Sequence, residues 1–294
     1  MKQTGKFLGC VLPLLVALFC QISVSLCFSI GYGAYMALKM LKLNITDSAE
    51  QAAYLVEHMY SADMIMLITA IATAGTLVIG VVWYHKHKPT EDIKFKEVIS
   101  GKLIAAVACL GLSLQLLISL CLSMVYPLLP QDLTDQYNTL MESLLGGNVW
   151  LSLFVTVILA PLAEEFLFRG ITLKKAQKIM PFFAANVLQA VLFGIYHMNL
   201  IQGVYAVALG LILGYTAKYF RSVWTAILLH AFVNGSAEVL SYLPEEWMES
   251  YIGIICVAFL GILLLFMAVK LYPCAKKEEN ITENEMFSEN SFDE

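Results

Sequence analysis

The chain has 294 residues, of which 59% are hydrophobic and 14% are charged, and its mean hydropathy is +0.74. Soluble globular chains are about 45–50% apolar and about 25% charged, so this composition argues against a water-soluble enzyme and against a disordered chain. The net charge is −5 and the sequence holds no domain-sized basic patch, which argues against nucleic acid as a partner.

Long apolar segments follow one another along the chain. A membrane-spanning helix needs about 20 mostly apolar residues. The first segment is longer than the core of a signal peptide, so we expect a retained helix, with a break or an interfacial stretch near Gly31 and Gly33. The sequence predicts an all-α integral membrane protein, a bundle of about eight transmembrane helices at 7–38, 62–84, 103–125, 148–168, 182–198, 203–219, 223–243 and 251–271.

Lysine and arginine concentrate in alternate connections. They gather at the N-terminus, between the second and third spans, after Arg169, at 218–221 and after the last span, whereas 126–147 and 243–250 have none. Since basic residues favour the cytoplasmic side, eight spans with both termini in the cytoplasm are expected. A chain this short, without large insertions, favours a multi-pass protein of a bacterial plasma membrane.

The spans and connections predict four parts. Residues 1–145 hold three spans and the external segments 40–61 and 126–147, each with an amphipathic turn or two. Residues 146–245 hold four spans and 246–275 the last one. The tail, 276–294, is acidic and lacks a hydrophobic period, so we expect it to be disordered.

Away from the ends of the predicted spans, ionisable residues cluster in the fourth, fifth and seventh. Such groups are costly in lipid and tend to face a bundle interior or a cavity for a functional reason. This concentration is the main functional signal in the sequence. The residues are Glu164, Glu165 and Arg169 in the fourth span, His197 in the fifth and His230 in the seventh, with Asn234 beside it.

Helical spacing predicts how these groups are arranged. Glu165 and Arg169 are four residues apart, so they share a helix face and can pair. Glu164 is rotated by about 100° from Glu165, so we expect the two carboxylates to point differently, with one facing a cavity. Glu164 can join the histidines only if the fourth helix continues past Arg169 to about Lys178.

Depth along the helices sets a further condition. His230 lies about 13 Å in from Arg221 and His197 about 25 Å in from Pro181, at 1.5 Å per residue. The two histidines therefore meet only if the spans are tilted around a cavity that opens to the cytoplasm.

These residue types can hydrolyse an amide without a covalent intermediate. A carboxylate and a histidine can activate a water, while a second histidine and an amide can stabilise the oxyanion. Glu164, His197 and His230 could instead bind zinc with a water in the open position. The His-Glu-x-x-His signature of zinc proteases is missing, which leaves the metal question open.

Two neighbouring features are given structural interpretations. Glu238 follows Asn234 by four residues but lies near the external end of its span, so we interpret it as interfacial. Gly210-x-x-x-Gly214 allows close contact between helices and predicts packing only.

Three motifs occur in order within successive spans. They are Glu164-Glu165-x-x-x-Arg169, Phe193-x-x-x-His197 and His230-x-x-x-Asn234. In this the chain resembles the CAAX-type intramembrane endopeptidases, the CPBP or Abi family. That family includes the Ras-converting prenyl endopeptidase and bacterial proteins linked to bacteriocin immunity and processing. The resemblance covers about 148–243, so 146–245 is expected to be the catalytic core.

The resemblance implies a role for each residue. Glu164 and His197 would activate the water, and His230 and Asn234 would form the oxyanion hole. The remaining motif residues would support the site, and no metal or other cofactor is expected. These supporting residues are Glu165, Arg169 and Phe193.

The leading hypothesis is an intramembrane endopeptidase that hydrolyses a peptide bond near the cytoplasmic leaflet. Its partners would be membrane lipids and a membrane-anchored or lipidated peptide or protein. The alternative is a non-catalytic immunity or scaffold protein of the same fold. A transporter with a proton relay is a third hypothesis, and the absence of an internal repeat argues against it.

Overall fold

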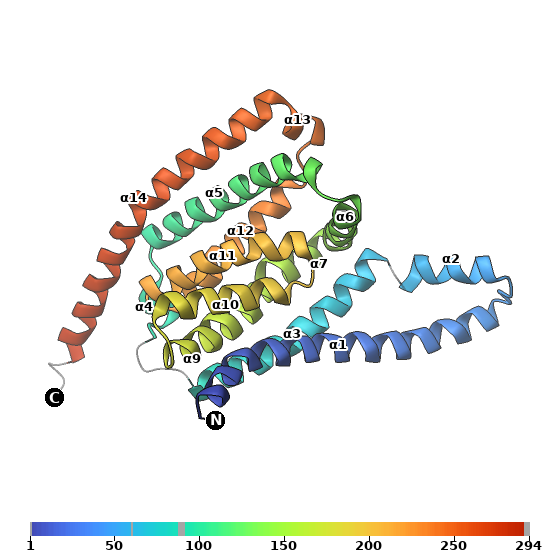
Figure 1. Cartoon of the computed structure of the whole chain (residues 1–294), viewed down its shortest axis with the longest axis horizontal. Helices are drawn as coiled ribbons and strands as arrows, with labels where there is room; N and C mark the ends of the chain where they lie inside the picture. The colour runs from blue at the N-terminus through green and yellow to red at the C-terminus, as the bar shows by residue number, and fades with distance from the viewer. Residues whose placement is uncertain (1, 60, 88–91, 291–294) are drawn as a thin grey trace.

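The computed structural model describes residues 2–59, 61–87 and 92–290, and Figure 1 shows them as a helical bundle. No strand occurs in these ranges, which confirms the predicted all-α fold. The elements before the site-bearing helix are α1 (Lys2–Lys42), α2 (Ser48–Met59), α3 (Ala62–His87), α4 (Phe95–Val98), α5 (Gly101–Val125), η1 (Tyr126–Leu128) and α6 (Gln131–Leu145). The others are α7 (Val149–Leu153), η2 (Phe154–Leu159), α8 (Ala160–Glu165), η3 (Phe166–Leu173), α9 (Lys174–Gln177), α10 (Phe182–Tyr196), α11 (Leu200–Tyr219), α12 (Val223–Leu240), α13 (Glu245–Glu249) and α14 (Tyr251–Asn290).

Several of these helices begin where a short polar side chain can cap them. The Ser100 hydroxyl accepts from the amide of Leu103 at the start of α5. The side chain of Asn148 accepts from two amides at the start of α7, and that of Asn199 accepts from one at the start of α11. Such caps satisfy donors that the first turn of a helix leaves unpaired.

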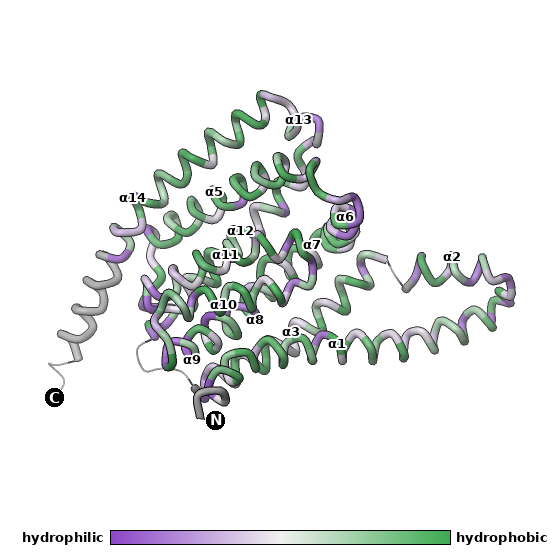
Figure 2. Tube along the Cα trace, in the orientation of Figure 1, coloured by the Kyte–Doolittle hydropathy of each residue, from purple (hydrophilic) through white to green (hydrophobic). Residues whose placement is uncertain are grey.

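Seven of the helical segments are long and apolar enough to cross a membrane. The predicted fifth span is the exception, because α10 has 15 residues and is about 22 Å long, less than the 30 Å hydrocarbon core. Figure 2 shows the hydrophilic segments gathered at the two ends of the bundle, near α4 and α9 at one end and near α6 and α13 at the other. The chain is thus a multi-pass membrane protein.

Two local predictions differ from the structure. The break expected near Gly31 and Gly33 is wrong, because α1 is one helix of 41 residues and no described glycine has a positive φ. The tail expected to be disordered continues α14 to Asn290. Low hydrophobicity gave no reason to predict helix there, although Glu and Lys are good helix formers.

The helix from α7 to α9 is the part of the fold that carries the site. It is helical without interruption from Val149 to Gln177, which confirms the predicted continuation past Arg169. Two of its stretches, η2 and η3, are π-helical, and they flank the α-helical turn α8. π-Helical stretches are rare and frequently mark functional sites.

The other helices surround this one. α3, α10 and α12 all contact it, α11 packs along α10, and α14 packs along α5 (Figure 1). Beyond its contacts with α3, α1 extends away from the bundle together with α2 (Figure 1). Apolar side chains there are exposed, such as Leu38 at 62% and Leu41 at 73%, as expected of a lipid-facing surface.

Gly214 on α11 permits a close approach between α11 and α10. A Cβ at this position would collide with the Asn186 amide oxygen and lie 2.7 Å from Gln189 Nε2. We expect Gly214→Ala to lower the free energy of unfolding by about 1–3 kcal/mol, because the side chains of α10 must shift. Gly31→Ala is the matched control, since nothing lies within 4 Å of its added Cβ. Thermal unfolding of the two variants in detergent measures the difference in stability, and equal unfolding midpoints would contradict the prediction.

Candidate active site

The predicted ion pair forms at the centre of the bundle. Arg169 Nη1 donates to Glu165 Oε1 at 2.6 Å, and both side chains are fully buried. The four-residue spacing places both on one helix face, and the surrounding helices exclude solvent. A buried pair of this kind is costly to break, because the remaining partner becomes an uncompensated charge.

His230 on α12 lies between the two neighbouring carboxylates. Its Nδ1 donates to Glu165 Oε1 at 2.8 Å, and its Nε2 lies 3.8 Å from Glu164 Oε2. The two carboxylate ends thus reach the same imidazole at different nitrogens, which helical spacing alone did not predict, and the expectation that one of them faces a cavity stays a prediction. A single ring can do this because its two nitrogens point in different directions.

Arg169 is held by a second set of contacts, from α11. Its Nη2 donates to the Gly210 carbonyl at 3.2 Å, and Gln189 Nε2 donates to the same oxygen at 2.8 Å. Gln189 Nε2 also donates to Asn186 Oδ1 at 2.8 Å. The guanidinium is thus fixed from two helices, with Glu165 on one side and the α11 backbone on the other.

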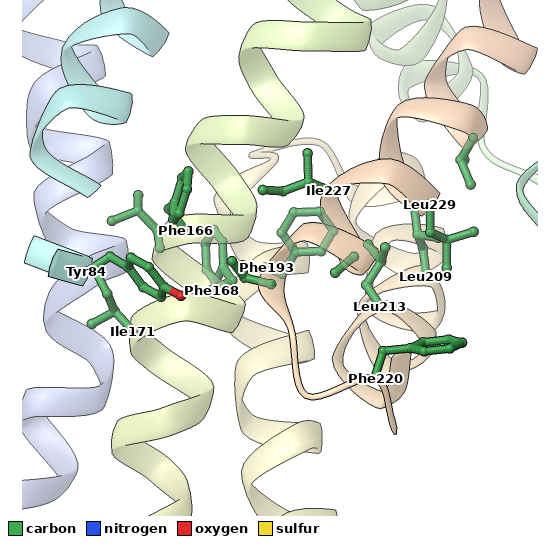
Figure 3. Close-up of a cluster of buried hydrophobic side chains, with 14 of the residues drawn as sticks. Tyr84, Phe166, Phe168, Ile171, Phe193, Leu209, Leu213, Phe220, Ile227 and Leu229 are labelled. Atoms are coloured by element: carbon green, nitrogen blue, oxygen red, sulfur yellow. The ribbon is translucent and has the colours of Figure 1, made fainter. Parts of the chain in front are cut away.

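Phe193 on α10 brings the two histidines to one place. Its buried ring lies 4.8 Å from the ring of His197 and 5.7 Å from that of His230, both in edge arrangements. The guanidinium of Arg169 lies 4.4 Å from the same ring. Figure 3 shows Phe193 within the buried apolar cluster, beside Phe168 and Ile227. The histidines come together in spite of their different positions along their helices.

His197 lies directly after the last residue of α10 and is half-buried. Its Nδ1 donates to the Phe193 carbonyl oxygen at 2.8 Å. This bond fixes the proton on Nδ1 and leaves the Nε2 lone pair to accept a proton or a hydrogen bond.

The described polar contact of Asn234, like that of His197, leads to a backbone carbonyl and not to another predicted catalytic residue. Its Nδ2 donates to the Thr156 carbonyl oxygen of η2 at 2.8 Å. It lies one turn beyond His230 on α12, so the two share a helix face. One of its two amide hydrogens is used in this bond, and the second is the group left to serve the predicted oxyanion hole.

Several polar residues at or near the site were missed or misinterpreted in the sequence. Asn186 and Gln189 are polar residues within an apolar span, a signal as strong as the one that identified the histidines. Gly210 does more than pack, because its carbonyl holds Arg169. Glu238, interpreted as interfacial, lies two residues before the end of α12, and the structure adds that it is 2% exposed, accepts from Ser152 and lies close to Tyr242.

Unpaired polar atoms are concentrated around the ion pair. Five buried side-chain atoms of the described residues have no hydrogen-bond partner, and three of them are Glu165 Oε2, Arg169 Nε and Gln189 Oε1. Buried polar atoms are nearly always paired in native proteins, so this concentration marks a place suited to a water or a ligand group.

The arrangement does not fit a zinc ion. In the described part of the chain, no group of three or more His, Cys, Asp or Glu residues is placed to hold a metal. Of the alternative set Glu164, His197 and His230, Glu164 Oε2 lies 3.8 Å from His230 Nε2, while the described contacts of His197 are with Phe193 and Tyr196. We therefore derive no step through a metal.

The comparison with protein families agrees with the motifs. Residues 146–236 match the family described as type II CAAX prenyl endopeptidase Rce1-like, which confirms the resemblance seen in the sequence. The match covers about a third of the chain and contains every predicted site residue. No curated protein and no solved structure matches the chain.

Proposed function

We propose that the chain is an intramembrane endopeptidase, since the CAAX prenyl endopeptidase match coincides with a buried cluster of two carboxylates and one imidazole, with a second imidazole on the same Phe193 ring. The contact of His230 with both Glu164 and Glu165 is the observation that carries the proposal. Burying these ionisable groups in an apolar bundle costs folding free energy. A catalytic role would explain why they lie there.

In the proposed reaction a water lies between Glu164 and the Nε2 lone pair of His197. These groups take its proton as the water oxygen attacks the peptide carbonyl carbon. The tetrahedral intermediate then collapses, the carbon–nitrogen bond breaks, and the proton passes to the departing amine. The products are a carboxylate and a free amine.

His230 is proposed to stabilise the oxyanion. An imidazolium there donates from Nδ1 to Glu165 and presents its Nε2 hydrogen to the developing negative charge. The second amide hydrogen of Asn234 adds a donor. Glu165, Arg169 and Phe193 position the imidazole and do not touch the reacting atoms.

The substrate is proposed to be a membrane-anchored or lipidated peptide cut near the cytoplasmic leaflet of a bacterial plasma membrane. The distribution of Lys and Arg supports this sidedness, with both termini in the cytoplasm. Both ends of the described chain lie on the same side of the bundle in Figure 1, which supports placing the two termini on one side of the membrane.

Hydrolysis by the protein in lipid vesicles tests the proposal, with anchored peptides as substrates and the products identified by mass spectrometry. We expect His197→Gln to slow cleavage by about 10²–10⁴-fold, because the general base loses its partner. His85→Gln is the matched control, since His85 is exposed at the end of α3.

Equal cleavage by the His197→Gln and His85→Gln proteins would contradict the proposed role. Metal analysis of the same preparation and cleavage in the presence of a chelator test the mechanism. We expect unchanged cleavage, whereas loss with the chelator and recovery with zinc would replace the mechanism by a zinc-dependent one.

A further inference from the structure

One face of α10 points toward the cluster and carries a buried amide. Gln189, Phe193 and His197 follow one another at intervals of four residues, so they lie on the same helix face. Gln189 is 0% exposed, in a helix that is otherwise mostly apolar. A buried amide costs folding free energy unless its polar atoms are bonded, so its partners indicate what it is kept for.

The amide of Gln189 uses both of its hydrogens. Nε2 donates to the Gly210 carbonyl oxygen at 2.8 Å and to Asn186 Oδ1 at 2.8 Å. Asn186 in turn donates from Nδ2 to the Leu211 carbonyl oxygen at 2.9 Å. Two side chains of α10 are thus bonded to two consecutive carbonyls of α11, which fixes the register between these helices.

The backbones of α10 and α11 approach closely at the same place. A Cβ on Gly210 would lie 3.1 Å from the Ala190 Cα, and one on Gly214 would lie 2.7 Å from Gln189 Nε2. α11 packs mainly along α10. The position of the Gly210 carbonyl is therefore set from α10, at Gln189.

That carbonyl is also the acceptor for Arg169. Its oxygen accepts from Arg169 Nη2 at 3.2 Å and from Gln189 Nε2 at 2.8 Å, which matches the two lone pairs of a carbonyl oxygen. Because Gln189 occupies one side of the oxygen, the guanidinium is restricted to the other. The Phe193 ring, one turn further along α10, lies 4.4 Å from the guanidinium. α10 thus constrains Arg169 at two successive turns.

From Arg169 the contacts continue to the imidazole of α12. Arg169 Nη1 donates to Glu165 Oε1 at 2.6 Å, and His230 Nδ1 donates to the same oxygen at 2.8 Å. All three side chains are buried. Since the members of a buried hydrogen-bonded network depend on one another, a displaced guanidinium would move the carboxylate oxygen and turn the His230 ring.

We propose that Gln189 is a positioning residue for the proposed reaction. It fixes the Gly210 carbonyl that holds Arg169. Through the ion pair it then fixes the direction in which the His230 ring faces the substrate, and it does not itself touch the reacting atoms. The effect on cleavage rests on the proposed function, whereas the effect on the His230 ring does not.

Gln189→Met tests the proposal, because methionine is of similar size and has no hydrogen to donate. We expect kcat for cleavage of an anchored peptide to fall about 10–100-fold, with KM changed by less than about twofold. Rates are taken per folded molecule, well below the unfolding midpoint, so that a loss of folded protein does not count as a loss of kcat. Gln115→Met is the matched control, since Gln115 is a half-buried amide of α5 whose described contact is with Ser119.

The nitrogen NMR signals of the His230 imidazole give a readout that does not depend on activity. They respond to the bond between Nδ1 and Glu165, and their absence from His230→Gln protein identifies them. We expect these signals to shift in Gln189→Met protein and to stay unchanged in Gln115→Met protein. A lower unfolding midpoint in Gln189→Met protein, with unchanged signals and unchanged kcat per folded molecule, would mean a purely structural role and would overturn the proposal.

A double-mutant cycle tests the path through Arg169. Lysine keeps the positive charge but lacks the planar fork of donors that reaches both Glu165 and Gly210. Adding Gln189→Met to Arg169→Lys protein should therefore lower kcat by less than about twofold and leave the His230 signals in place. A further loss of kcat as large as that caused by Gln189→Met alone would contradict the path.

The outcomes separate this inference from the proposed function. Shifted His230 signals in Gln189→Met protein, together with no cleavage of any anchored peptide by the unaltered protein, would uphold the positioning role and contradict the proposed function. Cleavage by the unaltered protein, with equal kcat in the Gln189→Met and Gln115→Met proteins, would overturn the inference and leave the proposed function in place.

Discussion

Replacing Glu165 by alanine is expected to lower the free energy of unfolding by about 3–5 kcal/mol. The side chain is fully buried, and its Oε1 accepts from both Arg169 and His230. Without it, the guanidinium keeps only the Gly210 carbonyl and the Phe193 ring as partners. Thermal or denaturant unfolding of the purified protein measures the loss.

The double variant Glu165→Ala with Arg169→Met is the control for this interpretation. It removes both charges and leaves no uncompensated cation, so its stability should lie well above that of Glu165→Ala alone. We expect no recovery of cleavage, because His230 still lacks the carboxylate that orients its ring. Additive losses of stability would mean that the pair is not coupled as the 2.6 Å contact implies.

Replacing Glu164 by glutamine is expected to slow peptide cleavage by about 10²–10⁴-fold while leaving the protein folded. Glutamine has nearly the same shape as glutamate but cannot take a proton from water. The described ionic contact of Glu164 is the 3.8 Å approach to His230, so little folding energy depends on its charge. Initial rates of cleavage in vesicles measure the loss of activity, and the unfolding midpoint measures any loss of stability.

Glu238→Gln provides the comparison for Glu164→Gln. Glu238 is also a buried carboxylate of the bundle, but its contacts are Ser152 and Tyr242 and it lies outside the cluster. Its loss should leave cleavage unchanged. Equal rates of cleavage in the two variants would remove Glu164 from the mechanism.

The same residues test the non-catalytic immunity or scaffold alternative. If cells that carry the Glu164→Gln or His230→Ala protein kept full immunity, that alternative would be favoured.

The parts of the structure that local spacing determines could be predicted from the sequence. Apolar length identified the spanning helices, and the four-residue interval identified the pair of Glu165 with Arg169. The scarcity of ionisable residues in the spans singled out the histidines, which the structure places on either side of Phe193. The division into domains, the roles of the site residues and the absence of a cofactor stay predictions.

The contacts that could not be predicted depend on backbone atoms from distant segments. The Gly210 carbonyl that holds Arg169 and the Thr156 carbonyl that holds Asn234 have no sequence signature, because every residue has a carbonyl. The convergence of the carboxylates on His230 was missed for a related reason. Helical rotation gives the direction of a side chain at its base, while the position of its end depends on the partner that another helix supplies.

The π-helical stretches η2 and η3 determine what a change of chain length would do to this helix. A π-helical turn accommodates more residues than an α-helical turn does, so its extra residue is taken up locally. Deleting one residue from Phe154–Leu159 should therefore allow a regular α-helix while α7 and α8 keep about the same relative direction. The backbone around Thr156, whose carbonyl accepts from Asn234, would be rebuilt. A shorter η2 should thus disturb Asn234 more than the carboxylates.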